Sequence, residues 1–186
     1  MFRKLLFLFF FFLLFIGVFY VVTSDVSAQN NAPTPISVSS TGTMTEPNSY
    51  EMFWPLVAGK TMGDSMYFLK TLKEDVVGAL IFGASFKANN EVLLATKRVL
   101  EAEKLVKEGK IDNTKKTLEA ALSQLDNASK NIDSAKSAGM NSNSQEMSDR
   151  LTNLVTFTTW FSENYKDTHD LFLQVSEKSS SLLLKL

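Results

Sequence analysis

The sequence predicts an all-α fold, an antiparallel bundle of about four helices that follows an N-terminal signal or anchor helix and a disordered tether. Three observations predict it. Only 8 glycines and 4 prolines occur among 186 residues, too few for a sheet-rich fold with many tight turns. Four stretches carry apolar residues at helical spacing. One of them, residues 111–139, repeats its apolar residues every seven positions.

Residues 1–28 are predicted to be a signal peptide or a single-span membrane anchor. Arg3 and Lys4 precede an unbroken apolar run over residues 5–22. This run is longer than the roughly 7–15 residues of a signal sequence and shorter than the roughly 20 residues of an average spanning helix. Val26 and Ala28 are residues of the kind that signal peptidase recognises, so cleavage between Ala28 and Gln29 is one outcome. Retention of the segment as an anchor is the other. Because the two cations stay inside, both outcomes place the rest of the chain outside the cytoplasm.

Residues 29–49 are rich in Ser, Thr, Pro and Asn and lack hydrophobic periodicity, which predicts a flexible linker. Residues 50–186 are predicted to be the helical bundle domain. The segment Tyr50–Leu56, which reads YEMFWPL, is expected to be a strap packed across the helices. An exposed aromatic patch for a partner or for the lipid interface is the alternative.

The first helix is expected to begin after Gly63, with Asp64 as N-cap, and to end near Gly83. Its apolar stripe should face the core and comprises Tyr67, Phe68, Leu69, Leu72, Val76 and Leu80. The second helix should run from Asn89 or Asn90 to Glu108, with an apolar side and a solvated side. The solvated side is predicted from three oppositely charged pairs at a spacing of four residues: Lys97 with Glu101, Glu103 with Lys107 and Lys104 with Glu108.

The third helix has the clearest pattern, with Asp112 as expected N-cap and Gly139 as terminator. Its heptad positions are Ile111, Leu118, Leu125 and Ile132, followed three residues later by Ala121, Ala128 and Ala135. Only about three residues separate it from the second helix, so these two should form an antiparallel hairpin. The fourth helix is expected to begin at Asn143, with Glu146 in a capping box. Its stripe should continue for more than thirty residues through Met147, Leu151, Leu154, Thr158, Phe161, Tyr165, Thr168, Phe172, Val175 and Leu182.

Composition excludes several functions. The formal net charge of −1 provides no basic surface for nucleic acid. There is no cysteine, so no disulfide, thiolate metal site or cysteine nucleophile is available. The single histidine, His169, with scattered carboxylates is too little for zinc, and we expect it to be a surface or hydrogen-bonded residue. No catalytic motif is found, so we predict no enzyme, no cofactor and no metal.

Two aromatic residues, Phe157 and Trp160, lie off the main stripe of the fourth helix. We expect the aromatic residues of this helix to fill the bundle core, as large rings usually do. The alternative for Phe157 and Trp160 is a partner contact or the lining of a cleft between helices. The heptad seams also allow oligomers.

Residues 53 to about 125 resemble a family of uncharacterised bacterial extracytoplasmic helical domains, a domain of unknown function. The matching residues are Pro55, Asp64, Ser65, Tyr67, Phe68, Leu69, Lys70, Lys97, Arg98, Leu100, Glu101, Ala102, Gly109 and Lys110. The loop over residues 59–63 departs from the family pattern. The resemblance implies a helical fold and an extracytoplasmic location, and it implies no reaction.

These observations predict a non-catalytic binding or scaffolding module of the cell envelope, either secreted or anchored in the cytoplasmic membrane by its N-terminal segment. An unknown protein partner is allowed. The alternative is a small-molecule sensor or carrier bundle with an aromatic-lined cleft. A hydrolase of envelope polymers is a third hypothesis, and it would need two carboxylates that face each other across a groove.

Overall fold

The computed structural model describes residues 45–139 and 145–186. The described residues form helices and no strand, which confirms the all-α prediction. None of the described helices combines the length and the apolar character that crossing a bilayer requires. The predicted membrane segment, residues 5–22, lies outside the described residues, as do the linker up to residue 44 and the cleavage candidates Ala28 and Gln29.

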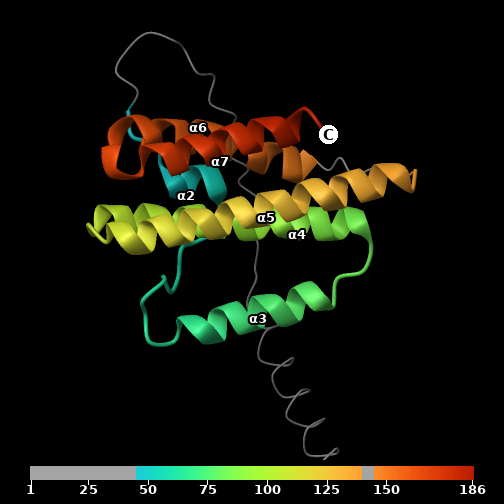
Figure 1. Cartoon of the computed structure of the whole chain (residues 1–186), viewed down its shortest axis with the longest axis horizontal. Helices are drawn as coiled ribbons and strands as arrows, with labels where there is room; N and C mark the ends of the chain where they lie inside the picture. The colour runs from blue at the N-terminus through green and yellow to red at the C-terminus, as the bar shows by residue number, and fades with distance from the viewer. Residues whose placement is uncertain (1–44, 140–144) are drawn as a thin grey trace, which may run out of the picture. The chain divides into compact units, whose positions relative to one another are not determined.

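Two antiparallel hairpins form the body of the bundle (Figure 1). The first joins α4 (Ala84–Lys107) to α5 (Ile111–Ser137), and the second joins α6 (Gln145–Asn164) to α7 (His169–Leu183). Helix α7 packs on α5 and α6 packs on α4, so the two hairpins lie face to face. The α4–α5 turn confirms the predicted hairpin. Its Gly109 has φ 72°, a left-handed conformation that favours glycine.

The heptad pattern of α5 is confirmed by burial. Its seam is fully enclosed at Leu118, Leu125, Ile132, Ala121, Ala128 and Ala135. The small alanine side chains allow the backbone of a neighbouring helix to approach closely. Two predicted helix starts were wrong. Asp112 lies in the first turn of α5 rather than at its N-cap, and α4 begins at Ala84, earlier than Asn89.

The single long fourth helix was a wrong prediction, because the chain reverses in its middle. Helix α6 ends at Asn164, and a short 3₁₀ helix, η1 (Lys166–Thr168), leads into α7. The predicted N-cap, Asn143, lies outside the described residues. The predicted stripe is nevertheless in the core. Its fully or almost fully buried members are Met147, Leu151, Leu154, Thr158, Phe161, Thr168, Phe172, Val175 and Leu182.

Side chains take the place of a glycine at this reversal. Tyr165 leaves the helical region, with φ −123° and ψ 88°. Asn164 Nδ2 donates to the carbonyl of Trp160 at 2.7 Å, and His169 Nδ1 donates to the carbonyl of Ser162 at 2.8 Å. The Ser162 carbonyl is one of the last four of α6, which a helix end leaves without intrahelical backbone partners. His169 is therefore an exposed, hydrogen-bonded residue, as predicted.

The segment Tyr50–Leu56 is a strap, as predicted, and begins with α2 (Ser49–Phe53). Phe53 is 3% exposed and its ring lies 5.4 Å from that of Phe157 on α6. Asn153 on α6 donates to the carbonyl of Met52 at 2.6 Å. The aromatic residues on either side of this anchor, Tyr50 and Trp54, remain exposed.

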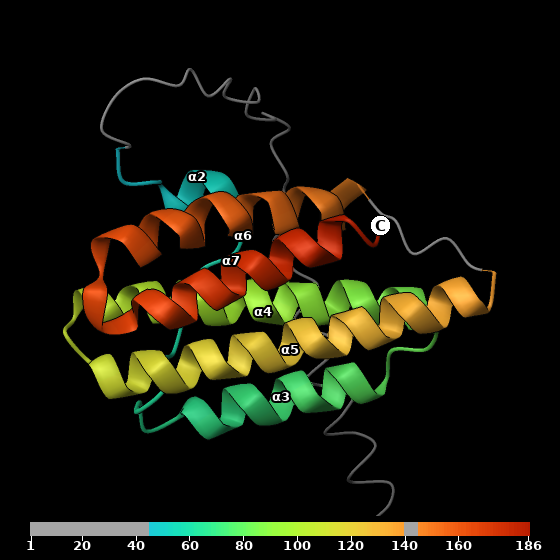
Figure 2. The ribbon, with the colours of Figure 1, turned by 45° about the horizontal axis from the view of Figure 1, so that its top comes forward.

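Helix α3 (Tyr67–Ala79) lies on the side of the α4–α5 hairpin opposite to α6 and α7 (Figures 1 and 2). None of its residues is fully buried. The predicted core stripe of this helix is therefore wrong, since Phe68, Leu72 and Leu80 are each more than half exposed. The predicted start is also wrong, because Asp64 lies in the preceding loop.

Candidate functional site

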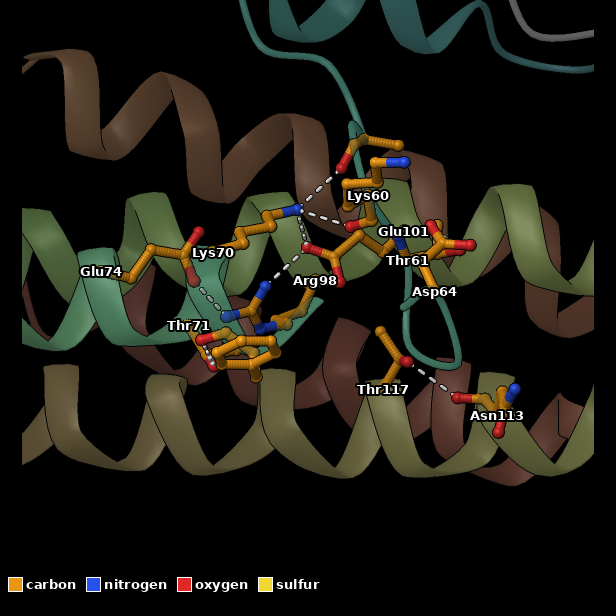
Figure 3. A network of polar contacts seen from close by, with 12 residues as sticks. Lys60, Thr61, Asp64, Lys70, Thr71, Glu74, Arg98, Glu101, Asn113 and Thr117 are labelled. Atoms are coloured by element: carbon orange, nitrogen blue, oxygen red, sulfur yellow. Dashed lines mark hydrogen bonds and ion pairs between the residues drawn. The ribbon is translucent and has the colours of Figure 1, made fainter. Parts of the chain in front are cut away.

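The face of α3 that meets the bundle is charged. Four residues form what we call the α3 ion network: Lys70 and Glu74 on α3, and Arg98 and Glu101 on α4 (Figure 3). One oxygen, Glu101 Oε1, receives both Lys70 Nζ and Arg98 Nη1 at 2.5 Å. The second guanidinium nitrogen, Arg98 Nη2, pairs with Glu74 Oε2. Two cations and two carboxylates thus join α3 to α4.

This network is buried, although sequence analysis placed Glu101 on a solvated face with Lys97. Glu101 is 0% exposed and Arg98 is 5% exposed, because α3 covers this face of α4. Buried charges are tolerated when they are paired, and here the four charges cancel. Glu101 Oε2 receives no hydrogen bond within the described part of the chain. The neighbouring predicted pair, Glu103 with Lys107, is confirmed at 2.7 Å.

Tyr67 completes the network. The Arg98 guanidinium lies over its ring, 5.6 Å from the centroid, which is cation–π geometry. Burial, followed by the Glu101 carboxylate, raises the pKa of Tyr67 to about 12. Burial lowers the pKa of Arg98, but Glu101 and Glu74 more than reverse this, so that its pKa lies above the ordinary value. The phenol is therefore neutral and the guanidinium charged at physiological pH.

The loop over residues 58–64 is fastened to the same network. Lys70 Nζ donates to the carbonyls of Ala58 at 2.8 Å and Lys60 at 3.0 Å. The backbone N–H of Thr61 donates to Asp64 Oδ2 at 2.7 Å, and this hydrogen bond lowers the pKa of the Asp64 carboxyl. Asp64 is engaged with Thr61, and α3 begins two residues later than predicted, with Met66 as its N-cap.

A second contact holds this loop against α5. Asn113 Nδ2 donates to the carbonyl of Met62 at 3.2 Å. Gly63, between Met62 and Asp64, has φ 99°, and a Cβ atom at this position would lie only 2.8 Å from Asn113 Nδ2. The loop therefore requires glycine here, both for its backbone conformation and for the space that Asn113 occupies.

The opposite face of α3 is apolar and turned toward solvent. Nine of the thirteen large hydrophobic side chains that are exposed in the described residues lie between positions 66 and 86. These nine are Met66, Phe68, Leu69, Leu72, Val76, Val77, Leu80, Phe82 and Phe86, which we call the α3 apolar surface. Amphipathic helices normally turn such a stripe toward the core. Helix α3 is inverted, with its ions inward and its apolar residues outward.

The other candidate residues lie elsewhere. Phe157 is completely buried between Phe53 and Phe161, so it belongs to the core and lines no surface. Trp160 is partly buried at the edge of this core, 5.1 Å from Phe161. Within the described residues, no group of three or more His, Asp or Glu side chains is arranged to hold a metal ion.

Sequence analysis missed the α3 ion network because its members are 24 and 31 residues apart. A signal was present in the motif residues that carry the family resemblance. Tyr67, Lys70, Arg98 and Glu101 all belong to those motifs, and all four meet in the network. Most of the residues that attach α3 to α4 therefore lie within the segments that carry the resemblance.

A further buried carboxylate on α4 gives a pH-dependent prediction. Glu91 Oε2 is buried without a hydrogen-bond partner in the described residues, and desolvation raises the pKa of Glu91. A raised carboxyl pKa means that the ionised form destabilises the fold above that pKa, and that this cost disappears as the pH falls through it. Glu91→Gln should therefore raise the unfolding free energy at neutral pH, by less than about 1 kcal/mol because solvent screens a partly exposed side chain. Urea unfolding should show the gain shrinking toward acidic pH, and a gain that grows there would contradict the assignment.

These contacts place the protein in the class of all-α bundles. One of its amphipathic helices, α3, is inverted and is attached to α4 by an ion network. The sequence model of one protein family, a domain of unknown function called DUF5667, matches residues 59–156, which is just over half of the chain. The protein belongs to this family, which confirms the predicted relationship to an uncharacterised domain family. The matched range contains the loop, α3, α4, α5 and the first part of α6. No curated protein and no solved structure matches the chain.

Proposed function

We infer that the protein is a non-catalytic binding module that acts outside the cytoplasm and presents α3 to a partner. The inverted orientation of α3 is the observation that carries this proposal. Large apolar surfaces that face water are uncommon on soluble monomers and mark interaction sites. The α3 ion network supports the same conclusion, because it holds the helix in this orientation by charges and leaves the apolar side free.

The proposed location rests on the N-terminal sequence. Two cations followed by an apolar run over residues 5–22 favour export of everything that follows. The protein would then work in the cell envelope, either released or held by the N-terminal segment.

The catalytic and small-molecule alternatives gain no support from the described side chains. The sensor hypothesis needed a cavity lined by Phe157, Trp160 or Phe161, and Phe157 and Phe161 are enclosed by other rings. The hydrolase hypothesis needed two free carboxylates across a groove. Glu74 and Glu101 are both paired with Arg98, and Lys70 supplies the second cation, so neither carboxylate faces an open groove as a free acid or base.

One labelling experiment tests both parts of the proposal, since the chain contains no cysteine of its own. Leu72→Cys places a thiol on the α3 apolar surface, and Thr156→Cys places one on the exposed side of α6. In intact cells, a membrane-impermeant maleimide should label Thr156→Cys readily and Leu72→Cys several-fold more slowly. In the purified protein, both should react at similar rates.

Each part of the proposal can fail separately in this experiment. Absence of Thr156→Cys labelling until the cells are lysed would contradict the extracytoplasmic location. Equal labelling of the two thiols in intact cells would contradict a covered α3 surface and hence the binding role.

A further inference from the structure

We propose that the partner of the α3 apolar surface is the surface of a lipid bilayer, into which α3 inserts its outward side while the bundle stays in water. This inference rests on the proposed function and names its partner. Three features of the described residues carry it: the width of the apolar arc, the continuation of the surface beyond the helix end, and the charges at its border.

The apolar arc is wider than the seam of a single helix–helix pair. Phe68 and Leu80 mark its borders, and Leu72 and Val76 lie near its middle. At 100° per residue these positions cover an arc of about 120°, and the exposed Asp75 and Lys73 lie just beyond its two borders. A helix that pairs with one other helix needs only the narrow stripe of two heptad positions. An apolar arc of about a third of the circumference, bordered by charges, fits a helix lying in the plane of a bilayer interface.

The apolar surface also continues past the end of the helix. Phe82 is 81% exposed and Phe86 is 72% exposed, and they lie in the connection to α4 and in its first turn. Exposed aromatic rings beside an amphipathic helix are typical of residues that enter the headgroup and acyl boundary.

The border charges complement a bilayer. Between residues 65 and 87, the exposed charged residues are Lys73, Asp75 and Lys87. The other two charged side chains on α3, Lys70 and Glu74, point inward and pair with α4. Lysines at the edge of an apolar face extend their ammonium groups toward phosphates while their stems stay in the apolar layer. The excess of one lysine over aspartate at this border adds a weak electrostatic attraction of the protein to anionic lipids.

The position of α3 in the chain makes this contact geometrically accessible. Only 22 residues separate the predicted membrane segment, which ends at Val22, from the first described residue, Thr45. Even fully extended, 22 residues reach no more than about 75 Å. If the segment is retained as an anchor, the domain stays within this distance of the membrane, which raises the effective concentration of lipid at α3.

The test uses the full chain in vesicles of phosphatidylcholine, with and without phosphatidylglycerol. An environment-sensitive fluorophore is attached to Phe82→Cys on the α3 apolar surface, or to Thr156→Cys on α6 as the matched control. Lipids with a nitroxide near the headgroup end of the acyl chain should quench the Phe82→Cys label several-fold more than the control. The added substitutions Leu72→Ser and Val76→Ser should reduce this quenching toward the control value without loss of helical circular dichroism.

The control arms separate bilayer contact from its rivals. Apolar insertion predicts quenching that changes little between low and high salt and increases modestly with phosphatidylglycerol. Phe82→Cys fluorescence that is insensitive to the nitroxide lipids at every ratio of protein to lipid would overturn the proposal. Blue-shifted emission that strengthens as the protein-to-lipid ratio rises, without nitroxide quenching, would overturn it in favour of a second copy of the chain. In either case the in-cell thiol labelling still decides whether α3 is covered, so the binding role can survive the loss of the lipid assignment.

Discussion

Glu101→Ala should be one of the two most damaging substitutions in the protein and should act first on α3. The change removes the carboxylate that both Lys70 and Arg98 share, and Arg98 is left 5% exposed with only Glu74 as partner. Removal of one member of a buried ion pair costs about 3–5 kcal/mol because the remaining charge is uncompensated. Release of α3 would return Arg98 to water. Amide hydrogen exchange should therefore show lost protection over residues 67–79, alongside a lower unfolding free energy in urea.

Glu103→Ala is the matched control for this prediction. Glu103 lies two residues further along α4 and pairs with Lys107, which is 41% exposed. Because Lys107 is solvated and also pairs with Glu46, loss of Glu103 should cost less than about 1 kcal/mol, and exchange over α3 should not change. If the two alanine variants had the same stability and the same α3 exchange, the ion network would not be what holds α3 in place.

Phe161→Ala should have a comparable effect on the opposite side of the bundle. Phe161 is fully buried, and its ring centroid lies 4.6 Å from Phe157, 5.2 Å from Tyr165 and 5.2 Å from Phe172. It joins α6 to α7 across the chain reversal. Truncation of a buried phenylalanine costs about 3–5 kcal/mol through lost transfer energy and the cavity that remains. Thermal and urea unfolding should both show the loss.

The same substitution at an exposed ring provides the control. Phe82 is 81% exposed, and Phe82→Ala should change the unfolding free energy by less than about 0.5 kcal/mol. A similar loss for both variants would mean that Phe82 packs against the bundle in solution. A negligible loss for Phe161→Ala would place the aromatic cluster outside the cooperative core.

Local patterns in the sequence were enough to predict most of the bundle. The α5 seam is determined by a strict seven-residue repeat, and Gly109 marks the turn between α4 and α5. Nine of the ten residues predicted for the stripe through α6 and α7 are buried, the exception being Tyr165. Such patterns show which side of a helix is buried, and this can be inferred from residues that are close together in the sequence.

The reversal after Asn164 could not be predicted in the same way. The apolar period of seven continues across it, from Phe161 to Thr168 and then to Val175, so the pattern is the same for one long helix and for two short ones. Neither glycine nor proline marks the turn. The side chains of Asn164 and His169 bond to carbonyls near the end of α6, and Phe172 returns to pack on Phe161. These contacts exist only after the chain has folded back.

The α3 ion network could not be predicted for a related reason. An amphipathic pattern shows that a helix has two different faces and does not show which of them meets the protein. For α3, the usual rule that apolar residues point inward gave the wrong orientation. The deciding interactions join Lys70 to Glu101 and Glu74 to Arg98, positions that are distant in the sequence. The family motifs contained most of these residues, although their spacing alone does not predict a pairing.

The inverted orientation of α3 separates two properties that most helices must satisfy with the same residues. Substitutions at Leu72 or Val76 change the side chains that α3 exposes on its outer face. Lys70 and Glu74 instead determine how α3 is attached to α4. Descendants of one ancestral chain can therefore acquire different affinities on the outer side while the inner side stays unchanged. If family members differ at the outer positions of α3 and agree at the inner ones, their binding surfaces have changed while the bundle has stayed the same.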